Sequence, residues 1–137
     1  MTDAAVIARL LTQLDYPCSG DEVRLRLGYW LDDPASRILL AEQERAVIGC
    51  LSLHAVPYLE RTGRWCRIES LVVDQAARGS GAGRALLAAA EEQARDWGCL
   101  LMEVTSLRTR TGAHAFYQQM GYTDGCGRSG RFLKELR

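Results

Sequence analysis

The chain has 137 residues, of which 47% are hydrophobic and 25% are charged, and its 17 basic and 17 acidic side chains leave no formal net charge. This length supports one domain with a substantial core and is too short for two domains of ordinary size. A balanced charge gives no bulk attraction for nucleic acid or for an anionic membrane surface, so we expect neither as a partner.

The cysteines are scattered without any spacing typical of a metal site or a disulfide framework. Three of them lie in apolar, strand-like segments, where a free thiol behaves as a small hydrophobe, and this favours a reducing compartment. No apolar stretch reaches the roughly 18 residues of a membrane span, and the N-terminus lacks a basic region followed by an apolar one. We therefore expect a cytoplasmic protein that uses no metal; its cysteines are Cys18, Cys50, Cys66, Cys99 and Cys126.

The N-terminal part of the chain predicts two helices. Thr2 or Asp3 can cap the first, whose apolar residues recur at helical spacing up to Asp15. The second runs from Asp21 to about Leu31, where two aspartates and a proline end it.

Three strands are expected next. Arg37–Glu42 and Ala46–Ala55 are short enough and closely enough spaced to form an antiparallel pair. After a longer turn from Pro57 to Arg64, the segment Arg67–Val73 is rich in β-branched and apolar residues, which is typical of a buried central strand.

A glycine-rich loop, Arg78-Gly79-Ser80-Gly81-Ala82-Gly83, connects this strand to a helix predicted over Ala82–Trp97. Alternating glycines permit positive φ and close approach of a ligand to the backbone, and the first-turn amides of the helix lie at the positive end of its dipole. Arg78 and Arg84 would be disfavoured at this helix end unless an anion bound there. The alternative is a glycine-rich turn with two solvated arginines. The Walker A pattern does not fit because no Gly-Lys-Ser/Thr follows, and the dinucleotide pattern does not fit because Arg84 replaces its third glycine.

The C-terminal part predicts one more strand and helix, followed by a strand-like piece. Cys99–Thr105 should lie parallel to the central strand through a right-handed crossover. A short helix ending at Gly121 places Ala113, Phe116, Tyr117 and Met120 on one face. Arg131–Leu136 has the composition of a last strand.

Two motifs resemble those of the GCN5-related N-acetyltransferase (GNAT) family. Arg78-x-x-Gly81-x-Gly83 directly after a strand resembles its acetyl-CoA-binding motif, and Ala113-His114-Ala115-Phe116-Tyr117-Gln118-Gln119-Met120-Gly121-Tyr122 resembles its second signature, Ala-x-x-Phe-Tyr-x-x-x-Gly-Phe/Tyr. The resemblance covers roughly Leu39 to Leu136.

The resemblance implies a single α/β domain over residues 1–137, with a mixed sheet flanked by helices and splayed between the central strand and the parallel strand that follows. Acetyl-CoA would be bound in the splay. The chain departs from the family in two places: the first edge strand is missing, which leaves a homodimer as an open alternative, and Arg110 stands where many relatives carry Asn.

The family likeness also assigns a set of cofactor contacts. In the family the loop amides hold the pyrophosphate of coenzyme A, and the backbone of the central strand receives the pantetheine arm much like an added strand. We accordingly predict that the cofactor is bound by Leu71, Val72, Val73, Arg78, Gly79, Ser80, Gly81, Ala82, Gly83, Arg84, Ala113 and Phe116.

Two residues match the family's catalytic positions. Acetyl transfer to an amine needs a proton for the departing thiolate and a group that takes the amine's proton. Tyr117 matches the general-acid tyrosine, and its alternative is a core aromatic residue in the helix stripe. Glu69 matches a glutamate that accepts the amine's proton, often through water. Its alternative is a buried carboxylate in a salt bridge to Arg67 or to another strand arginine.

These patterns favour an acetyltransferase that moves an acetyl group from acetyl-CoA to a primary amine of a small molecule or a protein. The alternatives are a non-catalytic acyl-CoA-binding module and a protein that binds nucleotide phosphates with the same loop. His54 and His114 have no metal-ligand spacing, so we interpret both as surface or capping residues. Charges in the expected acceptor region are mixed, so they do not identify the acceptor.

Overall fold

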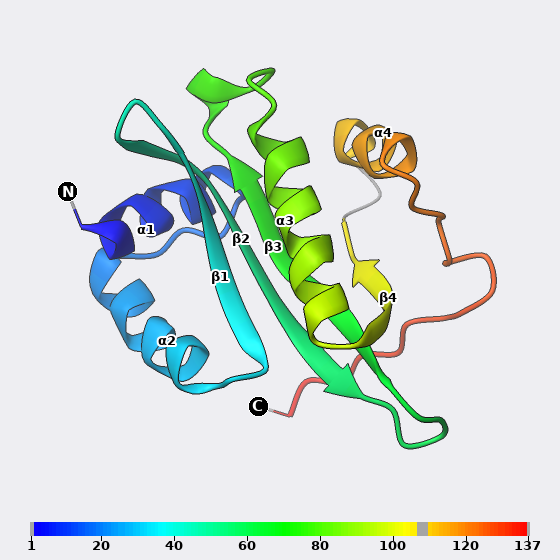
Figure 1. The fold of residues 1–137 in the computed structure, drawn as a ribbon. Helices are drawn as coiled ribbons and strands as arrows, with labels where there is room; N and C mark the ends of the chain where they lie inside the picture. Colours follow the sequence, from blue (N-terminus) through cyan, green and yellow to red (C-terminus); the bar gives the residue numbers. More distant parts are fainter. Residues whose placement is uncertain (1, 107–109, 137) are drawn as a thin grey trace. The chain divides into compact units, whose positions relative to one another are not determined.

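The computed structural model describes residues 2–106 and 110–136. Its internal contacts divide the chain into two compact units, Met1–Thr105 and Ser106–Arg137. The first unit contains most of the regular structure (Figure 1), namely α1 (Asp3–Gln13), α2 (Gly20–Asp32), β1 (Ser36–Gln43), β2 (Ala46–Pro57), β3 (Arg64–Val73), the 3₁₀ turn η1 (Gln75–Ala77), α3 (Ala82–Asp96) and β4 (Cys99–Val104). No helix among the described residues combines the length and the apolar character needed to cross a bilayer.

The four strands form one mixed sheet in the order β1-β2-β3-β4. The pairs β1–β2 and β2–β3 are antiparallel, whereas β4 lies parallel to β3, as the crossover through α3 predicts. Within the described residues no strand precedes α1. This arrangement confirms the predicted α/β fold.

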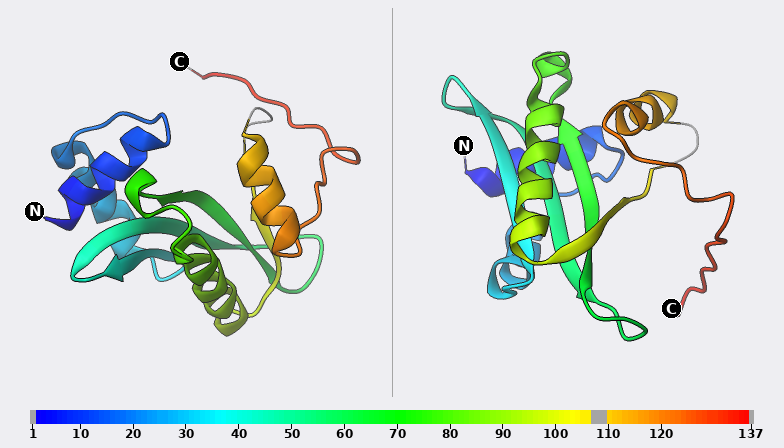
Figure 2. Two further views of the ribbon diagram at one scale, coloured as in Figure 1. Left: turned by 90° about the horizontal axis from the view of Figure 1, so that it is seen from above. Right: turned by 45° about the vertical axis from the view of Figure 1, so that its right-hand side comes forward.

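The helices of this unit cover opposite faces of the sheet (Figures 1 and 2). On one face, α1 packs its buried residues against Cys50 of β2 and Val72 of β3, and Val23 of α2 joins the same cluster. The other face carries Leu51, Leu53 and Ile68, all fully buried, beneath the apolar side of α3. Both faces of the central strands are therefore fixed by packing, which explains the apolar composition of β2 and β3.

A β-bulge interrupts the pairing of the two central strands. Ser52 pairs with Ser70 and the next residue, Leu53, pairs with Ile68, so Glu69 is an extra residue in β3. Side chains alternate along a strand, so the extra residue changes which positions face which side of the sheet. Glu69 and Ser70, although consecutive, both lie on the face that α1 and α2 cover in part.

The second unit contains α4 (Thr111–Gln119), which confirms the predicted short helix. Residues 107–109, within the polar segment before it, lie outside the described residues, and Arg110 at the N-cap gives the helix no side-chain cap. The strand predicted at Arg131–Leu136 is wrong: residues 131–136 have no regular structure, and Phe132, Leu133 and Leu136 are exposed. A strand needs a partner for its backbone groups, and the sequence pattern of one segment does not supply one.

Candidate active site

The loop between β3 and α3 has the conformation that its glycines permit. Gly79 and Gly81 have φ angles of +83° and +88°, a region that residues with a Cβ rarely adopt. Gly81 is the N-cap of α3, and the first backbone amide to reach a carbonyl there is that of Ala85, which donates to the oxygen of Gly81 at 3.0 Å. Among the described residues, the amides of Gly81, Gly83 and Arg84 donate to no acceptor, which leaves them available to an anion.

The surroundings of this loop are open and positively charged. Arg78, Ser80 and Arg84 are exposed, and a Cβ placed on Gly79 or Gly81 would meet no atom within 4 Å. Among the described residues, a single side chain contacts the first helical amides: the hydroxyl of Ser80 accepts weakly from the amide of Ala82 at 3.4 Å. Two arginines beside unpaired amides at a helix N-terminus make an arrangement suited to a phosphate-bearing ligand.

Helix α1 holds the start of this loop. Asp74 caps η1 by accepting from the amide of Ala76 at 3.0 Å, and it forms an ion pair with Arg9 at 3.2 Å. Gln13 donates to Asp74 at 3.4 Å and accepts from the amide of Gln75 at 2.9 Å. These contacts, led by the bond from Ala76, hold the pKa of the Asp74 carboxyl below its usual range.

The end of β3 beside the loop has one free edge. Pairing between β3 and β4 stops at Ile68 and Val104, although β3 continues to Val73. The predicted pantetheine contacts at Leu71, Val72 and Val73 therefore lie on a stretch with no described strand on its β4 side. The side chain of Val72 is buried in the core, so this stretch offers its backbone to a ligand.

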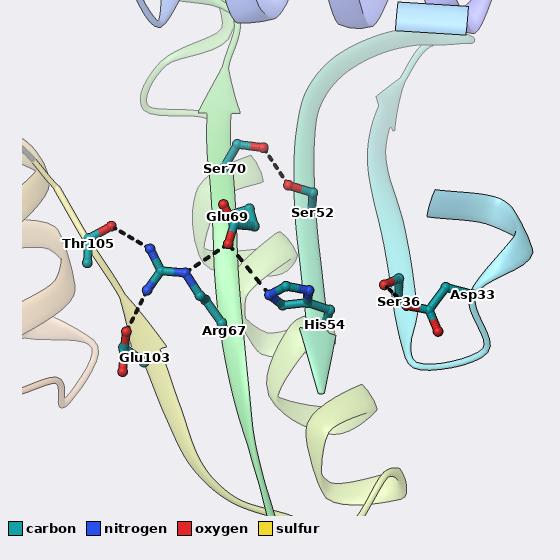
Figure 3. A network of polar contacts seen from close by, with 9 residues as sticks. All are labelled: Asp33, Ser36, Ser52, His54, Arg67, Glu69, Ser70, Glu103 and Thr105. Carbon is teal, nitrogen blue, oxygen red and sulfur yellow. Dashed lines mark hydrogen bonds and ion pairs between the residues drawn. The ribbon is translucent and has the colours of Figure 1, made fainter. Parts of the chain in front are cut away.

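Glu69 is exposed, contrary to the expectation that it is buried, because the bulge turns it toward an open part of the sheet face. The alternative of an ion pair with Arg67 is present: Arg67 Nε donates to Glu69 Oε1 at 2.8 Å (Figure 3). Arg67 also contacts Glu103 at 2.5 Å and Thr105 at 3.2 Å on β4 and just beyond it. The guanidinium thus links the two parallel strands just where they separate.

His54 belongs to the same group of side chains. Its interpretation from the sequence as a surface or capping residue did not predict this contact with Glu69. Its Nε2 lies 3.5 Å from Glu69 Oε1, and its ring stacks on Trp30 of α2 with centroids 5.7 Å apart. Beside them, the hydroxyls of Ser52 and Ser70 are 2.6 Å apart. The pairing register, which places His54 opposite Arg67, is what brings these residues together, and no sequence motif signals it.

In the second unit, α4 presents the predicted residues on one side. Ala113, Phe116 and Tyr117 are half-buried, and the Tyr117 ring lies 5.4 Å from that of Phe116 and 5.9 Å from that of Tyr122. Burial raises the pKa of the Tyr117 phenol. The phenol is therefore protonated at neutral and mildly alkaline pH.

Comparison with known proteins agrees with this geometry. The model of the acetyltransferase (GNAT) family matches residues 6–122. The aminoalkylphosphonate N-acetyltransferase of Salmonella typhimurium is 37% identical over 119 residues, which cover 86% of this chain and 75% of that protein. The blasticidin-S acetyltransferase of Streptomyces morookaense is 40% identical over 60 residues, which cover 43% of each protein.

A solved structure gives the same fold. A GNAT family acetyltransferase of Staphylococcus aureus superposes with a TM-score of 0.78 at 23% identity, covering 95% of this chain and 87% of that one. The family match spans both units, from within α1 to just beyond α4. The chain therefore belongs to the GNAT family of acetyltransferases.

Proposed function

We propose that this chain transfers an acetyl group from acetyl-CoA to the primary amine of a small molecule. The observation that carries the proposal is the continuous run from the free edge of β3 into the open amides of the glycine loop. A thioester on an extended arm with a pyrophosphate at its far end matches such a site, because the strand edge binds the arm and the loop binds the charge.

The proposed cofactor contacts follow this run. The pantetheine arm would pair with the backbone of Leu71–Val73, and the pyrophosphate would accept from the amides between Gly79 and Arg84. Arg78 and Arg84 are exposed beside those amides and would neutralise its charge. Ala113 and Phe116 on α4 are proposed as further contacts, with both units acting as one acyltransferase domain, because the family match includes both.

The proposed mechanism is direct attack of the amine on the thioester. Glu69, exposed on the sheet face, would take the amine's proton directly or through water. Tyr117 would give its proton to the departing thiolate, because a phenol is protonated at neutral pH and can donate. Neither step needs a metal ion.

A small-molecule acceptor is proposed because of the relatives' names. The Salmonella relative is named for an aminoalkylphosphonate and the Streptomyces relative for blasticidin S, neither of which is a protein. The test is a panel of small amines and lysine peptides with detection of free coenzyme A thiol. Turnover with small amines supports the proposal, and turnover confined to the peptides contradicts it.

Ligand binding is tested separately by thermal unfolding. At 100 times its dissociation constant, acetyl-CoA should raise the free energy of unfolding by about 2.7 kcal/mol, because its site exists only in the folded state. Stabilisation by ATP and not by acetyl-CoA would identify a nucleotide-phosphate binder instead. Stabilisation by acetyl-CoA without thiol release from any acceptor would identify a non-catalytic binding module.

A further inference from the structure

We propose that His54 and Glu69 act as one proton-accepting pair, in which the His54 imidazole receives the proton that Glu69 takes from the acceptor amine. This inference rests on the proposed acetyl transfer and concerns the path of the proton after it leaves the amine. His54 acts through Glu69 and is a positioning residue, whereas Glu69 is the group that meets the acceptor.

The two carboxylate oxygens of Glu69 differ in their contacts with the protein. Oε1 faces both Arg67 Nε at 2.8 Å and His54 Nε2 at 3.5 Å. Oε2 accepts no hydrogen bond from any described residue, and the Glu69 side chain is 41% exposed. One oxygen is therefore held by the protein while the other remains available to an incoming ammonium group or to a bridging water.

The His54 ring is held in place from several elements. Trp30 of α2 stacks on one side of it with an interplanar angle of 28°, and Ser36 of β1 is its partner across the sheet. The charged groups that face it are Glu69 and Arg67 from β3 and Asp33 from the turn before β1. Arg67 is itself fixed by Glu103, so the carboxylate beside the imidazole cannot swing away easily.

The chemistry favours passing the proton on. Of the two side chains that contact the carboxylate, Arg67 has no lone pair that could accept a proton, whereas the imidazole of His54 has one. Glu69 takes one proton from the ammonium on Oε2, and a half-turn of the carboxyl group about its Cγ–Cδ bond presents this O–H to His54 Nε2. The products are a neutral amine, a carboxylate and an imidazolium. The imidazolium remains paired with the carboxylate, and because the His54 side chain is 33% exposed it can then release the proton to solvent.

The first test removes the imidazole and returns it in solution. His54→Ala should lower kcat at pH 7 by roughly 10²-fold without changing the KM for acetyl-CoA. Added imidazole should restore at least a tenth of the wild-type rate, because the face of Trp30 on which the ring stacked is then vacant. The matched control is His114→Ala, which removes the only other histidine and should neither slow the enzyme nor respond to imidazole.

The second test separates proton transfer from hydrogen bonding. His54→Gln keeps a planar group that can donate to Glu69 but cannot carry a proton, so it should be as slow as His54→Ala and should approach the wild-type rate as the pH rises. The double variant with Glu69→Gln should be no slower than the slower single variant, because the two residues act in one step. Full activity of His54→Gln, a pH–rate profile parallel to wild type, or losses that multiply in the double variant would each overturn the proposal.

Failure of the pair is distinguishable from failure of the proposed function. If wild-type protein releases no thiol with any acceptor, the acetyl transfer itself is refuted, and this inference with it. If wild type turns over and the His54 variants match it at every pH, only the pair is refuted.

Discussion

Arg9 Nη1 of α1 lies 3.2 Å from Oδ2 of Asp74, the residue that opens the turn leading to the glycine loop. A side chain of the first helix therefore holds the segment that would bind the pyrophosphate. Gln13 also forms hydrogen bonds with Asp74 and with the amide of Gln75, so several contacts and not one surface ion pair join α1 to this turn. We call this set of contacts the α1 clamp. Exposed single pairs contribute little, whereas several bonds on one carboxylate fix a turn.

Asp74→Ala should weaken coenzyme A binding roughly fivefold, which corresponds to about 1 kcal/mol for loss of the bonds that order the turn. Calorimetric titration with coenzyme A measures it. Asp33→Ala is the matched control, because Asp33 also caps a turn, accepting from the amide of Ala35 at 2.9 Å and the hydroxyl of Ser36 at 2.8 Å, yet lies away from the loop in the chain. Equal losses in both variants would contradict the α1 clamp.

The lowered pKa of the Asp74 carboxyl also predicts how coenzyme A affinity depends on pH in acidic solution. Because the pKa of Asp74 is lowered from 3.8, its bonds stabilise the folded state at and above that ordinary value and are lost as the pH falls through the lowered pKa. Coenzyme A affinity should therefore not decline on account of Asp74 until the solution is more acidic than about pH 4. In Asp74→Ala, this acid loss should be absent; a titration series in acidic buffers checks both proteins.

Gly81→Ala should weaken coenzyme A binding at least tenfold while costing roughly 1–2 kcal/mol of stability, the cost of placing a Cβ at positive φ. Gly98→Ala is the control, because Gly98 has a φ of +74° at the other end of α3 and, like Gly81, has no atom within 4 Å of an added Cβ. Denaturant melts should show similar losses for the two variants, and calorimetry should show a binding defect only in Gly81→Ala. Comparable binding defects would make the loop a merely structural turn.

Tyr117→Phe should lower kcat by roughly 10²–10⁴-fold with little change in acetyl-CoA affinity, because the ring packing remains and the proton donor is lost. Tyr122→Phe removes a hydroxyl from the neighbouring ring, 5.9 Å away, and should keep wild-type turnover. Steady-state kinetics on both variants decides. Unchanged kcat in Tyr117→Phe would return this residue to a packing role.

The pH dependence of the rate in alkaline solution is a second test of the role of Tyr117. Its pKa is raised above 10.0 by burial, so the folded protein binds this proton more tightly than the unfolded chain does. Turnover should hold until the pH exceeds about 10, and stability should fall as the pH rises from there through the raised pKa. Melts and rates recorded from pH 8 to about pH 11 test the sign, and a decline below pH 9 that Tyr117→Phe retains would come from another group.

Local patterns in the sequence were sufficient for most of the fold. The segment from β3 through the glycine loop to α3 could be predicted because each of its parts has a local sequence pattern: an apolar strand, a run of turn residues and an amphipathic helix. The structure places α3 at Ala82–Asp96 and β4 parallel to β3, as predicted. The predicted strand at Arg131–Leu136 failed because its composition says nothing about a partner, and residues 131–136 have no regular structure.

The candidate site was predicted less completely, since part of it depends on register. Glu69 was identified from its place in the motif, but its exposure follows from an unpaired residue in β3 that no composition reveals. His54 was missed for the same reason: only the alignment of β2 against β3 places it opposite Arg67 and beside Glu69. Long-range pairing, rather than local propensity, decides such contacts.

Because of the bulge in β3, Glu69 is one residue more than the pairing with β2 requires. If Glu69 were deleted, Ile68, Ser70 and Leu71 would follow one another opposite Leu53, Ser52 and Leu51, which is a regular antiparallel ladder with every buried side chain on its present face. The sheet needs the residues on either side of the acid but not the acid itself. Deletion of the single Glu69 codon should therefore remove the proposed base and leave the sheet intact.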